Sequence, residues 1–101
     1  MFRQVVAFRW VEGASVEAKQ GYRDALDALR RIPELLALTS GDDAGHFDDN
    51  FDFVAVMDFA DFDSARVYVQ HPLHQAYVRD HVLKVVGERV IVQHDWTPTL
   101  G

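Results

Sequence analysis

The sequence predicts an α+β domain in which four strands and two helical regions follow one another in the order β-α-β-β-α-β. Three observations support this fold class. Short segments alternate in side-chain character at every second residue, which is the pattern of strands with one buried face. Two longer segments carry their apolar residues at helical spacing, and glycine or proline residues stand at the boundaries. The 101 residues contain no linker or low-complexity tract, so we expect one domain over residues 1–101.

The first half of the chain supplies a strand, a helix and a short second strand. Residues 2–10 alternate, and one of their faces consists of Phe2, Gln4, Val6, Phe8 and Trp10. Ser15 is a suitable N-cap for the helix that follows, and Pro33 ends that helix because proline cannot continue it. The apolar run 35–39 is predicted to be the second strand, and a polar loop with two glycines follows over residues 40–50.

The second half begins with the clearest strand of the chain. In residues 51–59, phenylalanine, alanine and methionine alternate with aspartate and valine. A second helical region is expected over residues 64–86, with Asp61 or Asp63 as its N-cap.

A proline divides this second helical region. His71 precedes Pro72, and a residue before proline disfavours the helical conformation, whereas proline suits the first turn of a renewed helix. Gly87 ends the region, and residues 90–96 are the predicted fourth strand. The resulting order is the split-βαβ or ferredoxin-like arrangement.

Two helices cover only one face of a four-stranded sheet. The face with the phenylalanines and methionine must take them, and we assign Val90, Val92, His94 and Trp96 to it. The other face then combines Val5, Ala7, Val54, Val56 and Ile91 with Arg3, Arg9, Asp52, Asp58, Gln93 and Asp95. An apolar centre rimmed by charge is the usual composition of an interface. We therefore predict a homodimer that closes sheet on sheet; the alternative is a monomer with an open, semi-polar sheet face.

Composition excludes several classes of function. The chain has 10 basic and 16 acidic residues and no cysteine, so disulfides, thiol nucleophiles and thiolate metal sites are absent. Residues 32–65 hold nine acidic residues and no Lys or Arg, which suits a nucleic-acid partner poorly. No uncharged stretch approaches the ~20 residues of a membrane span. We expect a cytoplasmic protein with neither nucleic-acid nor membrane partners.

Several segments carry a family resemblance. Residues 4–10, the strand 53–59 and the stretch Tyr68-Val69-Gln70-His71-Pro72-Leu73-His74 resemble the stress-responsive dimeric α/β-barrel (Dabb) family. The resemblance covers almost the whole chain, and Y-x-x-H-P-x-H is its most specific part. It implies a homodimeric α+β barrel of ferredoxin-like protomers. The family includes plant stress proteins, many bacterial members and a polyketide cyclase that makes olivetolic acid.

His74 and Tyr68 are the candidate catalytic residues. The break between the two half-helices allows both side chains to face one cavity. A neutral imidazole with a pKa near ~6.5 is a natural general acid or base, and a phenol can orient it or polarise a carbonyl. Resemblance to the cyclase implies His74 as the base and Tyr68 as its partner. The alternative is that both residues only pack the helix onto the sheet and hydrogen-bond each other.

Other residues are candidates for the walls of the cavity. Gln4 stands where the cyclase has a histidine, and the first-helix tyrosine of the cyclase aligns with Ala25. Gln4 can form hydrogen bonds but cannot titrate, so the same cyclisation of the same substrate is not expected. Phe8 and Trp10 are expected to line an apolar pocket or the core, and His94 is a further candidate polar group there.

Two features suggest metal binding, and we favour a structural interpretation of each. His71 and His74 form H-x-x-H, but a usable site needs three or four ligands, and His71 is better explained as a helix cap. The acidic loop 42–52 has the oxygen ligands that Ca²⁺ prefers, yet its spacing does not match an EF-hand. We expect a solvated loop, and neither metal nor cofactor.

Two functions remain open. The first is a cofactor-free cyclase, isomerase or lyase that acts on a polyketide-like, phenolic or lactone substrate, with Gln4 as a hydrogen-bond donor to it. The second is a non-catalytic homodimer that binds a small hydrophobic ligand or serves a stress-protective role. Monooxygenases and isomerases of other dimeric α+β barrel families are a third possibility.

Overall fold

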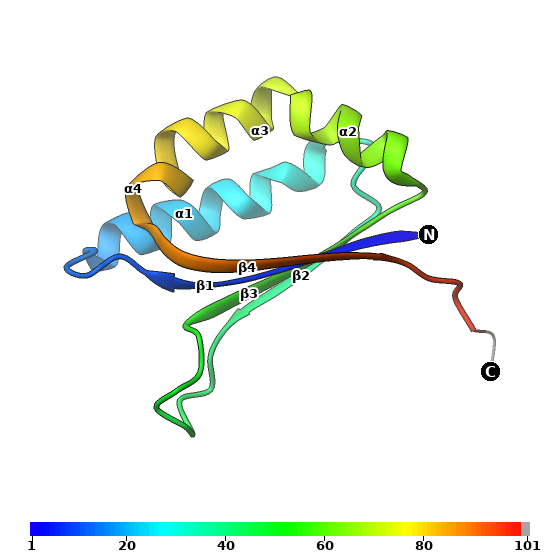
Figure 1. Cartoon of the computed structure of the whole chain (residues 1–101). Coiled ribbons are helices and arrows are strands. Elements are labelled where there is room, and N and C mark those ends of the chain that lie inside the picture. The colour runs from blue at the N-terminus through cyan, green and yellow to red at the C-terminus, as the bar shows by residue number, and fades with distance from the viewer. Residues whose placement is uncertain (100–101) are drawn as a thin grey trace.

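Four antiparallel strands form one sheet in the order β2-β3-β1-β4. Their bounds are β1 (Phe2–Trp10), β2 (Ala37–Asp42), β3 (Phe53–Phe59) and β4 (Val86–Asp95). The computed structural model describes residues 1–99. All the helices lie on one side of the sheet and leave the other face open (Figure 1). The element order and the α+β arrangement confirm the predicted ferredoxin-like fold.

The helices begin at the predicted caps. They are α1 (Val16–Ala28), the 3-10 turn η1 (Leu29–Arg31), α2 (Phe62–Gln70), α3 (Pro72–Tyr77), the π-helical turn η2 (Val78–Val82) and α4 (Leu83–Val85). Ser15 Oγ accepts the amide of Ala18 at 3.0 Å, and Asp61 Oδ1 accepts that of Ser64 at 2.8 Å. His71 Nδ1 accepts the amide of Leu73 at 3.1 Å, so His71 is the N-cap of α3, as predicted.

Strand pairing moves three predicted boundaries. The second strand runs from Ala37 to Asp42 instead of 35–39, because its pairing with β3 extends to the end of the hairpin. The third strand starts at Phe53. The fourth starts at Val86, which pairs with Trp10, so Gly87 lies within the strand. A Cβ at Gly87 would stand 3.0 Å from the carbonyl oxygen of Arg9, and this close approach explains the glycine.

The register reverses the predicted faces of β4. Gln93 pairs with Gln4, Val92 with Val5 and His94 with Arg3. Because directly paired residues share a face, Ile91 and Gln93 face the helices, whereas Val90, Val92 and His94 lie on the open face. The physical reason is that β4 is an edge strand: Val90, Ile91 and Val92 are 48%, 47% and 53% exposed. Apolar residues stand on both of its faces, so its pattern does not distinguish them.

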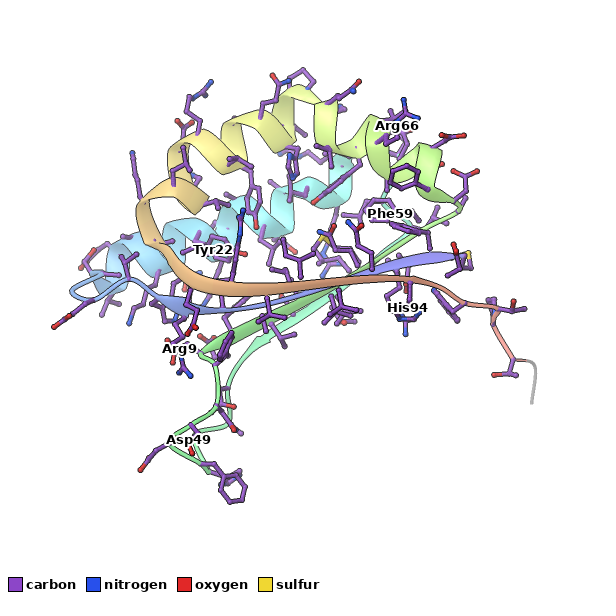
Figure 2. All side chains as sticks on the ribbon, in the orientation of Figure 1. Arg9, Tyr22, Asp49, Phe59, Arg66 and His94 are labelled. Atoms are coloured by element: carbon purple, nitrogen blue, oxygen red, sulfur yellow. The ribbon has the colours of Figure 1, made fainter. Side chains whose placement is uncertain are left out.

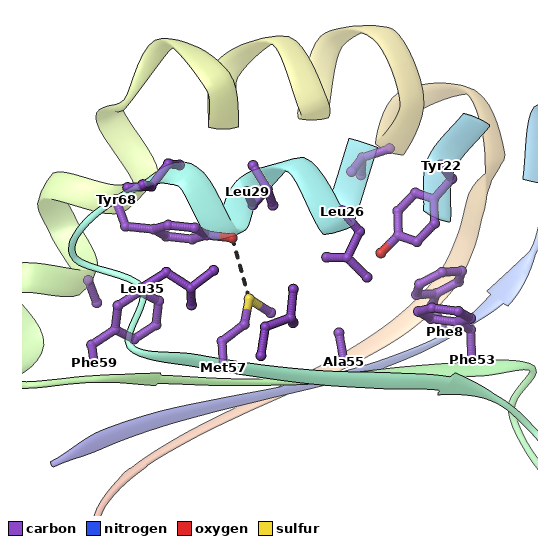
Figure 3. Close-up of a cluster of buried hydrophobic side chains, with 14 of the residues drawn as sticks. Phe8, Tyr22, Leu26, Leu29, Leu35, Phe53, Ala55, Met57, Phe59 and Tyr68 are labelled. Carbon is purple, nitrogen blue, oxygen red and sulfur yellow. Dashed lines mark hydrogen bonds between the residues drawn. The ribbon is translucent and has the colours of Figure 1, made fainter. Parts of the chain in front are cut away.

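The core lies between the helices and the sheet (Figure 3). Phe8, Tyr22 and Phe53 form an aromatic cluster with ring centroids 5.2–5.5 Å apart. Leu26, Leu29 and Ile32 continue the buried surface along α1 and η1. This packing holds α1 against the sheet and sets one wall of the space beneath α2 and α3.

The open face keeps an apolar centre and a charged edge. Val5 of β1 lies between its two pairing partners, Val56 of β3 and Val92 of β4. Asp58 accepts two hydrogen bonds from Arg3, at 2.8 and 3.0 Å, and one from the indole of Trp96 at 3.2 Å. The Arg3 guanidinium therefore holds the pKa of the Asp58 carboxyl below its usual value. Over residues 1–99, helices are too short or too polar to cross a membrane.

Candidate functional site

A cavity of about 200 Å³ lies between the helix-facing side of the sheet and the second helical region. Aliphatic side chains, Met57 included, make up half of its wall. Six polar or amphipathic side chains also line it: Gln4, Tyr22, Tyr68, His74, Tyr77 and Arg89. An apolar hollow with a few convergent polar groups is the usual form of a small-molecule site.

His74 lies in α3, where the break at Pro72 has changed the direction of the chain. Its imidazole packs between two phenol rings, with centroids 4.8 Å from Tyr68 and 5.6 Å from Tyr77. Burial lowers the pKa of His74 below its ordinary value of 6.5, partly opposed by a hydrogen bond with the backbone of Val69. At neutral pH the imidazole is therefore uncharged and can accept a proton.

Tyr68, from α2, is almost fully buried, with 2% of its surface exposed. Its hydroxyl donates to Met57 Sδ at 3.3 Å (Figure 3), and its contact with His74 is between the rings. Burial strongly raises the pKa of the phenol, so Tyr68 remains protonated. Both predicted catalytic residues line the same cavity, and the hydroxyl of Tyr68 points toward β3.

A tyrosine pair forms a further polar group that the sequence analysis missed. The hydroxyls of Tyr22 and Tyr77 lie 2.8 Å apart. Burial raises the pKa of Tyr22 to about 12 and raises that of Tyr77 as well, so both phenols are neutral hydrogen-bonding groups. Tyr77 stands three residues after His74, a spacing that places both on one helix face, and this signal could have identified it.

Tyr22 also changes the comparison with the cyclase. Alignment at the Ile-Pro step places the first-helix tyrosine of the cyclase at Ala25, which lines a separate hollow between α1 and α3. Tyr22 lies about one helical turn before Ala25 and reaches the main cavity. The cavity therefore contains a phenol from α1, although the alignment indicated its loss.

Gln4 and Phe8 line the cavity from β1. Gln93 Nε2 donates to Gln4 Oε1 at 2.7 Å, so the carbonyl oxygen of Gln4 is engaged and its NH₂ group remains a donor. Trp10 does not line the cavity. It packs against Phe8 and Tyr22, with ring centroids 5.0 and 5.5 Å away, and supports the aromatic wall from behind.

The predicted position of His94 was wrong. His94 pairs with Arg3 on the open face of the sheet, and Figure 2 shows His94 on the side opposite to the helices. The helix-facing positions of β4 belong to Gln93, Ile91 and Arg89. Arg89 is thus a cavity residue that was not predicted, because it precedes the predicted fourth strand (90–96), whose faces were also reversed.

The acidic loop is held by its own contacts. Asp43 accepts hydrogen bonds from the Gly45 amide at 2.9 Å and from Asn50 Nδ2 at 3.0 Å. Asp42 pairs with Arg23 at 2.6 Å, and Asp52 accepts the Trp10 amide at 2.9 Å. Within residues 1–99, the acidic and histidine side chains form no group of three or more that could hold a metal ion.

Comparisons with known proteins identify a family whose pattern the chain matches and solved structures with a similar fold. The sequence pattern of the family described as Stress responsive A/B Barrel Domain matches residues 2–97. Among curated proteins, none matches the chain. A dimeric ferredoxin-like protein of unknown function from Thermobifida fusca is 31% identical, with a TM-score of 0.85, over 94% of this chain and 90% of that one.

Two further solved structures have lower identity. A Dabb family protein from Mesorhizobium loti is 22% identical, with a TM-score of 0.79, over 96% of this chain and 97% of that one. A hydroxynitrile lyase from Passiflora edulis is 16% identical, with a TM-score of 0.84, over 99% and 96% of the two chains. At these identities the likeness shows the fold alone.

Proposed function

Since the chain belongs to the stress-responsive A/B barrel (Dabb) family, we propose that it is a cofactor-independent acid–base enzyme acting on a small, largely apolar molecule. One observation carries this proposal. His74 is a half-buried imidazole with a lowered pKa, and it faces a cavity that also contains protonated phenols. A neutral base beside hydrogen-bond donors is the arrangement that proton transfer at a carbon next to a carbonyl requires.

The chemistry follows from the protonation states. The lone pair of the His74 imidazole takes a proton from the carbon next to a substrate carbonyl, and the electron pair of the broken C–H bond moves into the developing enolate. A phenol of the Tyr22–Tyr77 pair or the Gln4 NH₂ group donates a hydrogen bond to the enolate oxygen. In a cyclase, the enolate carbon then attacks a second carbonyl, whose oxygen takes the proton of the imidazolium. In an isomerase, the imidazolium instead returns the proton at another position of the conjugated system. A hydroxynitrile lyase shares the fold, so the scaffold is compatible with lyase chemistry too.

A non-catalytic ligand-binding protein is the second candidate. The observation that favours it is the hydrogen bond from the Tyr68 hydroxyl to Met57 Sδ, which engages the group expected to assist His74. In that case the cavity holds a small hydrophobic or phenolic ligand without transforming it. The two candidates differ in one measurable respect, because only the enzyme accelerates the loss of a carbon-bound proton.

Exchange of carbon-bound protons for deuterium tests the enzyme without knowledge of the substrate. We expect the protein to accelerate this exchange in at least one member of a panel of cyclic β-diketones and phenolic ketones in D₂O, as followed by proton NMR. His74→Gln should reduce the acceleration by about 10²-fold or more, the usual contribution of a general base.

His81→Gln is the matched control. His81 lies on η2 beside Gly21 of α1 and does not line the cavity, so this variant should keep the activity. Equal exchange rates for the wild-type protein and His74→Gln, with unchanged melting temperatures, would rule out His74 as the base.

The same family membership supports a homodimer. The Thermobifida fusca protein is described as dimeric, and the open sheet face of this chain presents Val54, Val90 and Val92, which are 38–53% exposed. We propose that a second copy of the chain covers this face. Burial of apolar side chains would supply the driving force, and the rim charges would orient the two copies.

A further inference from the structure

Arg89 gives the cavity beside His74 a positive charge. Among residues 1–99, it is the one member of the cavity wall with a permanent charge, because the wall includes neither acidic residues nor lysine. The whole chain carries a formal charge of −6. Arg89 is exposed to solvent, and a positive charge at this position in an acidic protein is a local feature of the site.

The position of Arg89 follows from strand pairing. It stands opposite Phe8 on β1, whose side chain is buried beneath the helices, so Arg89 lies on the helix-facing side of the edge strand. Its charge acts on Tyr77, where it lowers the pKa of the phenol against the larger opposing effect of burial. Tyr77 nevertheless stays protonated and does not neutralise the guanidinium.

Arg89 also differs from six other arginines of the chain. Arg3, Arg9, Arg23, Arg30, Arg66 and Arg79 each have a carboxylate within 4.0 Å, whereas Arg89 and Arg31 form no such ion pair within residues 1–99. An unpaired guanidinium beside apolar surface is a strong recognition group for a carboxylate, since it can donate two parallel hydrogen bonds to it.

A neighbouring groove also contains an arginine, although this one is paired with Asp63 at 3.3 Å. It encloses about 150 Å³, shares Gln4, Tyr68 and Val69 with the cavity, and likewise has one arginine, Arg66, and no acidic side chain in its wall. The acidic residues of the segment 32–65 thus avoid both hollows. Gln4, Tyr68 and Val69 line both hollows, and the apolar residues around them suit a ligand with a hydrocarbon body and one negative end.

We propose that Arg89 makes the site selective for small organic carboxylates, whose charged group contacts the guanidinium while the apolar body lies against the aliphatic and aromatic wall. This inference rests on the proposed function, because it assumes that the cavity beside His74 holds the ligand. It adds the chemical class of that ligand and names Arg89 as the residue that determines specificity.

A matched pair of probes tests the inference. Trans-cinnamate and trans-cinnamamide have the same aromatic body, and only the first is charged at neutral pH. NMR titration of the wild-type protein should give a dissociation constant about tenfold lower for cinnamate, the effect of one charge-assisted contact. Arg89→Gln should remove this preference and leave the affinity for cinnamamide unchanged. Arg89→Lys keeps the charge but loses the two parallel hydrogen bonds, so it should keep only part of the preference.

Arg31→Gln is the control for net charge. Arg31 is an exposed arginine that lines neither hollow, so this variant should bind cinnamate as the wild type does. Equal affinities of the wild type for the two probes would overturn the role of Arg89, and so would a loss of the cinnamate preference in Arg31→Gln as large as that in Arg89→Gln. In either case, binding of cinnamamide would still support a ligand cavity. If neither probe shifts the resonances of cavity residues, the inference fails, and the deuterium-exchange assay decides separately whether the proposed acid–base chemistry stands.

Discussion

At the scale of the residue, burial controls the chemistry of His74. Its imidazole is packed between the rings of Tyr68 and Tyr77, and removal from water disfavours the charged form. Because the phenols around it are protonated, the nearest polar groups are uncharged. The result is a base that is available at neutral pH without a carboxylate to activate it.

The lowered pKa of His74 predicts a pH dependence of stability. The unfolded chain binds a proton near pH 6.5, whereas the folded protein binds it only at lower pH, so the unfolded state holds more protons between these two values. His74 therefore stabilises the fold fully above pH 6.5, and this stability is lost as the pH falls toward the folded pKa. The melting temperature of the wild type minus that of His74→Gln should decrease between pH 7 and pH 5; a difference independent of pH would contradict the shift.

The Tyr22–Tyr77 pair predicts a strong energetic coupling. Tyr77→Phe leaves the buried hydroxyl of Tyr22 without its partner at 2.8 Å, which should cost about 1–2 kcal/mol of unfolding free energy. In Tyr22→Phe combined with Tyr77→Phe, both hydroxyls are gone, so the loss should be smaller than the sum of the single losses. Urea unfolding of the four proteins measures this coupling. Additive losses would mean that the two hydroxyls do not interact.

At the scale of the element, the break between α2 and α3 positions the site. Pro72 ends the hydrogen-bond pattern of α2, and the His71 side chain caps α3. Tyr68 and His74 belong to different helices as a result, yet their rings are in contact. The π-helical turn η2 then follows, and its residues Val78 and Val82 also line the cavity; such turns are frequent at functional sites.

The cap of α3 can be tested directly. His71→Ala removes the acceptor of the Leu73 amide and should lower the unfolding free energy by about 0.5–1 kcal/mol. His71→Asn should restore most of this loss, because asparagine is among the best N-cap residues. Denaturant unfolding gives both values. If His71→Asn is as unstable as His71→Ala, the role of His71 is not that of a cap.

The alternation of residue types predicts the buried face of some strands but not of others. Residues of β1 and β3 alternate clearly, because one of their faces is buried in the core, and their faces were predicted correctly. Residues of β4 do not alternate, because the strand lies at the edge of the sheet and is exposed. The pairing of Gln93 with Gln4 decides its faces, and pairing is a property of two segments that are far apart in the sequence.

At the scale of the whole molecule, the open face of the sheet exposes apolar side chains that no element of the chain covers within residues 1–99. The helices cover only one face (Figure 1), while on the other face Val5 lies between Val56 and Val92. The observed register of β4 favours an interface more strongly than the predicted one, because Val90 and Val92 lie on the open face where Ile91 and Gln93 had been expected. Association of two copies would bury these side chains.

A charge at the centre of that face should prevent the proposed dimer. Val56→Lys places an ammonium group between β1 and β2 on the open face, where its desolvation would oppose association. Sedimentation velocity should give a dimer for the wild type and a monomer for this variant. Val67→Lys, at an exposed position of α2, is the control and should stay dimeric. A wild-type protein that sediments as a monomer at micromolar concentration would refute the dimer.

The amino-acid sequence by itself determined the element order, the helix caps and the break at Pro72, because these depend on neighbours within a few residues. It also indicated His74, Tyr68, Gln4 and Phe8 as cavity residues through local pattern and family resemblance. Only the tertiary structure showed that Tyr22, Tyr77 and Arg89 join them, and that His94 does not. The physical reason is that the cavity forms where β1, β4, α1 and the second helical region meet, and strand register, which joins distant segments, decides which side chains face it.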